Sequence, residues 1–382
     1  MSEYLEKYGF DKTPVHDCHY HIDRHYKLSD SIKYLQMNRE YLGMDKLVLL
    51  CFTEDSMQVD PYENVRGLYF KEFLNDSIYT FAGLHSYLDE RDTKEHYLKQ
   101  IEFFYNAGFD GIKIMGEGKA ACRSYFNHKL DDERFDGFFA FAEEKQFPLL
   151  IHAGDVPNSE EMRLGCDIVH TEILNVLEKH PNLQITFAHM MFLSDNIAKL
   201  TEIFEKYPNI SIDLALGGFM RDVSNDIEIW HEFFTKYSHR ILFGTDNYNN
   251  FITNDDCFEL IVRNEPVRKL LEYKEPFSAR VYGAKTVFNP LLISKDAVDN
   301  IYRNNFIRLY GEKPRKVNYN LALEYTTKLL DAFKNERLDV FARFELPDWI
   351  YPEEQENLYK GASFAIETLE EIKAYLETKV SK

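Results

Sequence analysis

Histidine and aspartate residues stand at the ends of separate apolar segments, and their types suit a divalent metal ion. A His-x-His pair, His19 and His21, ends the first such segment, and His152, His189 and Asp246 each end a later one. Imidazole nitrogens and carboxylate oxygens are the ligands of catalytic zinc sites, which keep one position open for water. Since residues i and i+2 of a strand point the same way, both histidines of the pair can reach one ion.

The His-x-His pair is weak evidence when taken alone. With 13 histidines in 382 residues, roughly 0.4 such pairs are expected by chance. A hydrogen-bonded core histidine explains any single one of these residues equally well, and Asp246 could instead be a helix N-cap. Ligand-type residues at four separate segment ends are far more specific and favour a metal site. His16 has the opposite parity to His19, so we expect it to face the helices.

Eight short apolar segments, most of them followed by a helical pattern, could bring these side chains together. Several are unbroken runs of strand-forming residues, such as Leu47–Leu50 and Leu149–Ile151, which is typical of parallel strands buried on both faces. Eight β/α units predict an α/β fold, a (β/α)8 TIM barrel, with an open doubly wound sheet as the alternative. The predicted strands span residues 15–22, 46–52, 78–84, 111–115, 147–153, 184–190, 209–216 and 240–246.

Two regions fall outside this pattern. Residues 248–293 are too long for an ordinary connection and are expected to form a lid or an insertion. A helix is expected to begin after Ser294 as its N-cap and to end at Gly311. We therefore expect a barrel domain over residues 1–315 and a C-terminal helical extension over residues 316–382. The extension is expected to pack on the barrel or on a second subunit of a homodimer.

Charge and cysteine content narrow the class of protein. There are 45 basic and 64 acidic residues, a net charge of −19, so nucleic acids and anionic membranes would be repelled. The five cysteines include no CxxC pair, and the N-terminal residues are too charged for a signal peptide. No apolar run approaches membrane-spanning length. These features predict a cytoplasmic protein with reduced thiols that acts on a small molecule.

Taken together, the motifs resemble the amidohydrolase superfamily, particularly the amidohydrolase-related family that includes aminocarboxymuconate-semialdehyde decarboxylase. The stretch Asp17–His21 is similar to the first-strand motif of that family, Pro148–Gly154 to its fifth strand and Ile241–Asp246 to its eighth. The stretch Asn300–Gly311 resembles the helix that closes the domain. The likeness covers residues 13–312 and leaves the long connection after the eighth strand and the tail unexplained.

The resemblance implies a ligand set for one divalent metal, with Zn2+ favoured and Mn2+ as the alternative: His19, His21, His152 and Asp246. It also implies that Asp246 accepts the proton of the metal-activated water and that His189 lies beside that water. Lys113 lies within the fourth predicted strand, near the expected mouth of the barrel. In binuclear relatives such a lysine is carboxylated and bridges two metals, whereas in many mononuclear relatives it contacts the substrate. We favour one metal, and the binuclear alternative stays open.

Basic residues near the expected active-site face suggest a carboxylated substrate. The candidates are Arg24, His85, Arg123 and Arg163, since an arginine fork binds a carboxylate bidentately. Loop charges balanced by neighbouring acidic residues are an equally good explanation. We predict a metal-dependent hydrolase that attacks a C–N or C–O bond of a small molecule. The alternatives are a non-oxidative decarboxylase or hydratase that uses the same metal site, and a non-catalytic metal-binding barrel.

Overall fold

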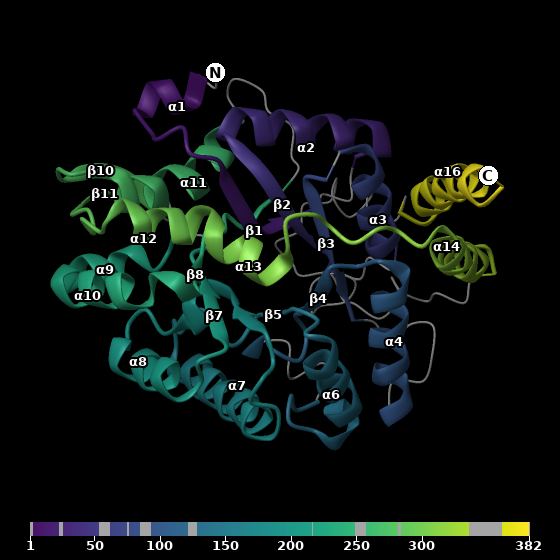
Figure 1. Ribbon diagram of the computed structural model, residues 1–382, viewed down its shortest axis with the longest axis horizontal. Coiled ribbons are helices and arrows are strands. Elements are labelled where there is room, and N and C mark those ends of the chain that lie inside the picture. Colours follow the sequence, from purple (N-terminus) through teal and green to yellow (C-terminus); the bar gives the residue numbers. More distant parts are fainter. Residues whose placement is uncertain are drawn as a thin grey trace.

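Parallel strands form the centre of the molecule, and helices surround them (Figure 1). The computed structural model describes residues 3–22, 26–52, 62–74, 76–84, 93–120, 128–215, 217–248, 257–281, 284–335 and 361–381. The nine strands of the main sheet are β1 Val15–His21, β2 Met44–Leu50, β3 Ile78–Gly83, β4 Gly111–Ile114, β5 Leu149–Ile151, β6 Ile185–Phe187, β7 Ile210–Asp213, β8 Ile241–Leu242 and β9 Asn247–Tyr248. Their order is β8-β7-β6-β5-β4-β3-β2-β1-β9, and every pair is parallel.

The two ends of this sheet meet because β8 and β9 belong to one short segment. Its start, β8, pairs with β7, and its end, β9, pairs with β1. Between them, Cys18 N donates to Phe243 O at 3.0 Å and Asp246 N donates to His19 O at 2.7 Å. Residues 241–248 therefore act as the eighth strand of a closed ring, and the predicted (β/α)8 barrel is confirmed.

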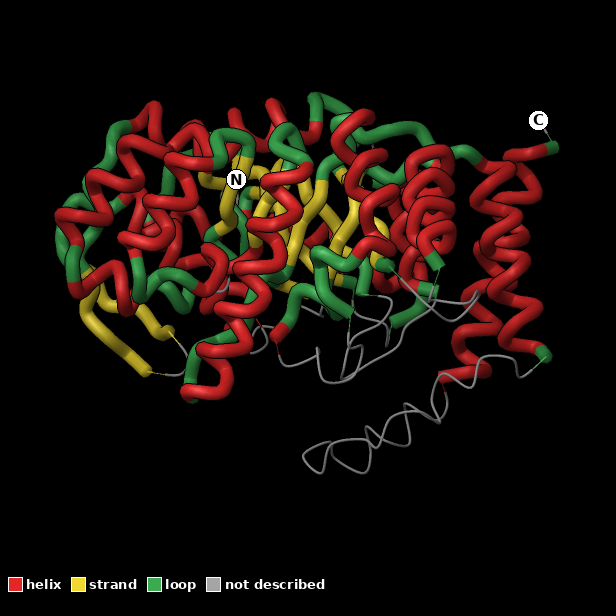
Figure 2. The backbone as a smooth tube through the Cα atoms, turned by 90° about the horizontal axis from the view of Figure 1, so that it is seen from below, coloured by secondary structure: helices red, strands yellow, loops and turns green. Residues whose placement is uncertain are grey.

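The helices that precede and connect the strands form the outer layer (Figure 2). They are α1 Glu3–Tyr8, α2 Leu28–Leu42, α3 Glu63–Phe73, α4 Lys94–Ala107, α6 Asp136–Lys145, α7 Glu160–Lys179, α8 Ile197–Lys206, α9 Met220–Asn225 and α10 Ile227–Tyr237. The aliphatic and aromatic residues on their inner faces pack against the outer face of the strands in one large buried cluster. In the described part of the chain, no helix is both long enough and apolar enough to cross a membrane.

A second apolar cluster fills the inside of the barrel. Strand residues such as Val48, Phe81 and Leu150 meet Phe306 and Tyr310, which come from a helix that closes one end of the barrel. That helix consists of α12 Lys295–Asp299, a π-helical turn at Asn300–Asn304 and α13 Asn305–Tyr310. The side chain of Ser294 caps it as predicted, accepting from Ala297 N at 3.2 Å.

The long connection after the eighth strand is an insertion with its own elements. It contains the helix α11 Cys257–Glu272 and the antiparallel hairpin of β10 Phe277–Val281 and β11 Ala284–Phe288. The C-terminal region contains α14 Tyr319–Lys334 and α16 Gly361–Val380, which pack on each other and lie beside α3 and α4. The hairpin and the α14–α16 pair lie on opposite sides of the barrel (Figures 1 and 2).

Three local expectations differ from the structure. The sixth strand was expected to reach residue 190, but it ends at Phe187 and is followed by a left-handed turn. The fifth strand was expected over residues 147–153, but β5 spans only Leu149–Ile151. His16 does not obey the predicted alternation. Its ring contacts Phe306 of the interior cluster at 5.1 Å, since the register of β1 shifts between Asp17 and Tyr20.

A buried ion pair ties the C-terminal region to the barrel. Asp110, which precedes β4, accepts from Lys71 Nζ at 2.6 Å and from Thr80 N at 2.7 Å through one oxygen. Its other oxygen accepts from Arg315 N at 2.7 Å. The Lys71 and Asp110 side chains are only 3% and 2% exposed. This one carboxylate therefore joins α3, β3 and the segment that leads into α14.

We predict that Asp110→Ala lowers the free energy of unfolding by about 3–5 kcal/mol, because it leaves the buried Lys71 ammonium without its counter-charge. Urea denaturation of the variant and of the native protein measures the change. Glu133→Ala is the control, since it removes the exposed ion pair with Lys94 (59% and 75% exposed) and should cost no more than about 1 kcal/mol. Equal effects of the two substitutions would contradict this account.

Candidate metal centre

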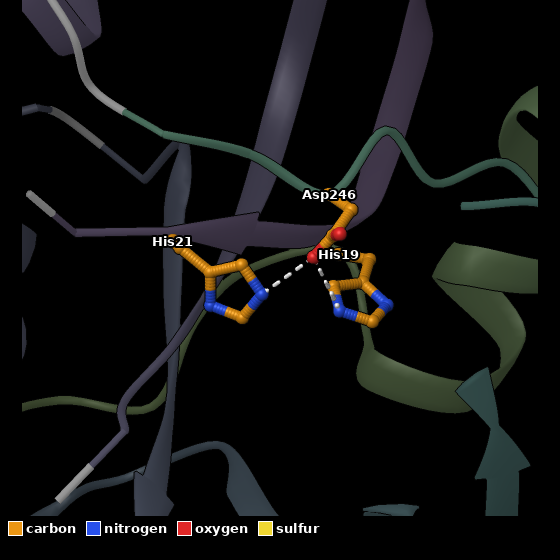
Figure 3. A group of neighbouring side chains, drawn as sticks. All are labelled: His19, His21 and Asp246. Carbon is orange, nitrogen blue, oxygen red and sulfur yellow. Dashed lines mark hydrogen bonds and ion pairs between the residues drawn. The ribbon is translucent and has the colours of Figure 1, made fainter. Parts of the chain in front are cut away.

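Three side chains from the seam between β1 and residues 241–248 form a compact group at the carboxyl end of the barrel (Figure 3). The ligand atoms of His19, His21 and Asp246 all lie within 4.8 Å of one another. Asp246 Oδ1 is 2.8 Å from His21 Nε2 and 3.2 Å from His19 Nε2. Both histidines are buried and the Asp246 side chain is 16% exposed, so one oxygen and two nitrogens converge at a mostly buried position.

The hydrogen bonds of His21 leave its Nε2 as an acceptor. Nδ1 is 3.1 Å from the carbonyl oxygen of Leu50, which can only accept, so Nδ1 carries the proton. Burial lowers the pKa of His21 to about 4, which keeps the ring neutral at pH 7. Its Nε2 lone pair then faces Asp246 Oδ1 at 2.8 Å, and two acceptors so close together repel each other. A divalent cation bound to both atoms satisfies them, so these residues fit a metal.

Asp213, at the end of β7, orients two histidines at once. Its Oδ2 accepts from His19 Nδ1 at 2.8 Å, and its Oδ1 accepts from His189 N at 2.8 Å. A carboxylate on the second nitrogen of a metal-binding histidine fixes the ring and its tautomer. Burial and Lys113 oppose protonation of His19, but Asp213 and the contact with Asp246 raise the pKa of His19 above its usual value. The sequence analysis missed Asp213, although an aspartate that ends a buried strand was a usable signal.

His152 Nε2 and Lys113 Nζ lie next to this group, and neither atom has a hydrogen-bond partner among the described residues. The His152 ring is 5.0 Å from that of His189, and within the described residues its buried Nε2 has no partner. Burial and the neighbouring positive charges lower the pKa of His152 well below its usual value, so the ring is neutral and can act as a metal ligand. Lys113 Nζ is likewise buried and unpartnered among the described residues, and burial lowers its pKa to about 8. The orphaned nitrogen of His152 beside the three-residue group extends the fit to a metal.

His189 reaches the centre through an unusual backbone. Four consecutive residues, His189 to Phe192, have φ angles between 53° and 58°, the left-handed region that non-glycine residues seldom adopt. The turn places the His189 ring 4.9 Å from His19 and 5.0 Å from His152. Burial lowers the pKa of His189 to about 4. Backbone strain of this kind persists only where the surroundings hold it in place, and it often marks functional sites.

His170 of α7 holds the ends of β5 and β6 together. Its Nε2 lies 3.1 Å from Ala153 O and 2.8 Å from Met191 O, so it donates to both carbonyls. Ala153 follows His152 in the chain, and Met191 belongs to the left-handed turn. Burial lowers the pKa of His170 to about 4, since only the neutral ring is favoured there. This contact was also missed by the sequence analysis.

A cleft of about 340 Å3 opens beside His189. Loops after β5, β6 and β7 line it, with Phe192 and Phe219 as apolar groups and Arg163 and Arg221 as cations. Arg163 is the only proposed substrate-binding residue in the described part of the chain, and it pairs with Asp195 at 2.7 Å. The remaining three candidates, Arg24, His85 and Arg123, lie outside the described residues. Arg221, at the start of α9, was not predicted.

Comparison with known families identifies the class of protein. Residues 83–311, more than half of the chain, match the family model described as Amidohydrolase. The chain therefore belongs to the amidohydrolase family, whose members are enzymes that generally use a divalent metal. The matched region includes His152, His189 and Asp246 but begins after β1, so the placement of His19 and His21 rests on the geometry given above. No curated protein matches the sequence.

Solved structures of other proteins share the fold at low sequence identity. An uncharacterized TIM-barrel protein from Bordetella bronchiseptica has a TM-score of 0.53 and 13% identity, over 78% of this chain and 99% of that chain. The 4-oxalomesaconate hydratase from Rhodopseudomonas palustris has a TM-score of 0.50 and 12% identity, over 82% of this chain and 99% of that chain. At these identities the similarity supports the barrel fold.

We predict that Asp213→Asn weakens zinc binding by about 10–100-fold, because the amide no longer holds the His19 tautomer and the His189 backbone as the carboxylate does. Competition with a coloured chelator measures the affinity. Asp195→Asn is the matched control, since Asp195 pairs with Arg163 in the cleft and contacts no proposed ligand. Native affinity in Asp213→Asn would show that this contact does not orient the site.

The pKa of His170 predicts a pH effect on stability. The unfolded chain binds a proton at this histidine near pH 6.5, whereas the folded protein binds it only near pH 4. Lowering the pH through this window therefore favours unfolding, by roughly 3 kcal/mol in total, since one pKa unit is about 1.4 kcal/mol. His170→Gln cannot titrate and should lose less stability between pH 6.5 and pH 4 than the native protein. Parallel stability curves, from urea denaturation at each pH, would refute the assignment.

Proposed function

We propose that this protein is a metal-dependent hydrolase that cleaves a C–N or C–O bond of a small, carboxylated molecule. One observation carries the proposal: His21 Nε2 and Asp246 Oδ1, both acceptors, face each other at 2.8 Å with His19 Nε2 beside them. Purely structural zinc sites are usually closed by cysteine and histidine, whereas a mixed set of imidazole and carboxylate is typical of catalytic sites. Membership of an enzyme family is consistent with this choice.

Four residues would hold the metal: His19, His21, His152 and Asp246. The first two and Asp246 form the compact group, and His152 supplies a buried nitrogen that lacks any other partner among the described residues. Zn2+ is proposed first, because imidazole and carboxylate suit it, and Mn2+ is the alternative. When bound, such an ion supplies positive charge that polarises the substrate and lowers the pKa of water in the site.

The protein's own groups would move and hold protons around the reacting bond. Asp246 is proposed to accept a proton from the attacking water and to return it to the leaving group. His189 is neutral because burial lowers its pKa to about 4, and its ring, beside His19 and His152, is proposed to orient the attacking water. Lys113 Nζ is proposed to contact the substrate, or to bridge a second metal if it is carboxylated.

The cleft beside His189 is the proposed binding place for the body of the substrate. Its volume of about 340 Å3 suits a small molecule, and Phe192 and Phe219 offer an apolar surface. Arg163 and Arg221 lie at the same cleft and are proposed to bind a carboxylate, since a guanidinium pairs well with that group. Asp195 already neutralises part of this charge, so the ligand would have to compete with an exposed ion pair.

A lyase is the second candidate. The same arginines that could anchor a carboxylate could also present it for non-oxidative decarboxylation or direct the addition of water to a double bond. The hydratase from Rhodopseudomonas palustris, whose fold is similar, is named for the addition of water. A product assay separates the candidates, because a hydrolase yields two fragments, a decarboxylase yields CO2 and a hydratase yields one product that has gained water.

The first test is elemental analysis of the purified protein. We predict about one equivalent of divalent metal per chain. His19→Ala and Asp246→Ala should lose it, because each removes a ligand from the compact group. His231→Ala is the control, since this histidine of α10 bonds to Leu291 O and takes no part in the site.

About two equivalents would instead indicate a carboxylated Lys113 and a binuclear centre. Absence of metal in the native protein, even after zinc is added to the apo form, would overturn the proposed function.

A further inference from the structure

Asp246 is held at both of its ends, and one contact comes from the insertion. Its Oδ1 faces His19 and His21, whereas its Oδ2 lies 3.1 Å from Nη1 of Arg263 on α11. The same guanidinium nitrogen also donates to the main-chain oxygen of Asp246. Arg263 therefore binds the carboxylate and the backbone of one residue at the same time.

The backbone at Asp246 needs such support. Its φ angle is 58°, in the left-handed region that aspartate tolerates better than most side chains but still at a cost. The N–H donates to His19 O at 2.7 Å, and the C=O accepts from Arg263. Since the amide, the carbonyl and Oδ2 of Asp246 each have a hydrogen-bond partner, the side chain is held in one orientation relative to the histidines.

Helix α11, which carries Arg263, is held in place by hydrogen bonds to other helices. Tyr4 of α1 donates from its hydroxyl to Asn264 Oδ1 at 2.6 Å, directly beside Arg263 in the chain. One turn further on, Arg268 bonds to Glu272 at 2.8 Å, and Tyr302 of the closing helix donates to the same carboxylate at 2.7 Å. Arg268 and Tyr302 are buried. The helix is thus fixed to α1 and to the closing helix, which hold the backbone of Arg263 in place beside Asp246.

We infer that Arg263 is a positioning residue that restricts Asp246 to one ligating oxygen. The inference rests on the proposed metal site. A carboxylate with two unrestrained oxygens can bind an ion through both, as bidentate ligands do, and would fill an additional coordination position. With Oδ2 held by the guanidinium, Asp246 offers only Oδ1 towards the histidines. The position that a second oxygen would occupy stays available to water or substrate, which a catalytic site requires.

The test counts the ligands at the metal. Zinc-loaded native protein and three variants, Arg263→Met, Arg263→Lys and Tyr4→Phe, are compared by X-ray absorption at the zinc edge. Arg263→Met keeps the length of the side chain without its donors, so we expect a gain of about one oxygen neighbour at zinc. Arg263→Lys retains a cationic donor and should keep the native number. Tyr4→Phe removes a support of α11 without touching Asp246 and should also keep the native number, with a lower unfolding temperature.

The outcomes separate this inference from the proposed function. A native protein that takes up zinc, together with an unchanged ligand count in Arg263→Met, overturns the role of Arg263 and leaves the metal site standing. A gain of oxygen in Tyr4→Phe equal to that in Arg263→Met would mean that any loosening of α11 suffices, which also overturns the assignment to the guanidinium. Native protein that binds no zinc removes the metal site itself, and the inference with it.

Discussion

The seam between β1 and residues 241–248 is the constraint on which the site depends. It closes the barrel, and it also brings His19 and His21 within reach of Asp246. Asp17 strengthens it from inside, because this fully buried carboxylate accepts from His19 N, Thr245 N and the Thr245 hydroxyl. Burial raises the pKa of Asp17 to about 7, while these hydrogen bonds and nearby His19 favour its charged form. A single side chain therefore spans the two strands that carry the three central groups.

Conformational strain and buried charge are concentrated at the same place. The left-handed residues His189 and Asp246 both lie at strand ends, and each is held by a polar partner, Asp213 in one case and Arg263 in the other. The closing helix contributes as well, since its π-helical turn offers Ile301 O to Phe243 N at 3.0 Å, three residues before Asp246. The site is thus positioned by the barrel, by the closing helix and by the insertion together.

Much of this arrangement follows from simple sequence patterns. Runs such as Leu47–Leu50 predicted the strands because a strand buried on both faces has little room for polar residues. His19, His21 and Asp246 were predicted to converge because parallel strands in a barrel end at one face, and the structure brings them together. The predicted ends of the fifth and sixth strands lie beyond the observed ones. β5 and β6 are only three residues long, and the flanking apolar residues continue into turns.

The residues that the sequence analysis missed share a physical reason. Asp213 and His170 act through partners that are distant in the chain, and no spacing rule links a histidine in a helix to two carbonyls that follow different strands. Arg263 lies in a connection whose apolar pattern did not predict a helix. The turn at His189 to Phe192 contains no glycine or asparagine, so its composition does not predict a left-handed backbone. Tertiary contacts decide these features.

The seam that closes the barrel also has a consequence for the synthesis of the chain on the ribosome. His19 is made early, but Asp246 follows 227 residues later (246 − 19), and at 5–20 residues per second that interval is roughly 10–45 s. During this interval the first strand can pair on one side at most, with β2, and its other edge is exposed to any strand-like segment nearby. No metal can be captured by the complete group during synthesis of the first seven β/α units. Nascent chains of this protein therefore need either protection of that edge or a final segment that pairs quickly once it emerges.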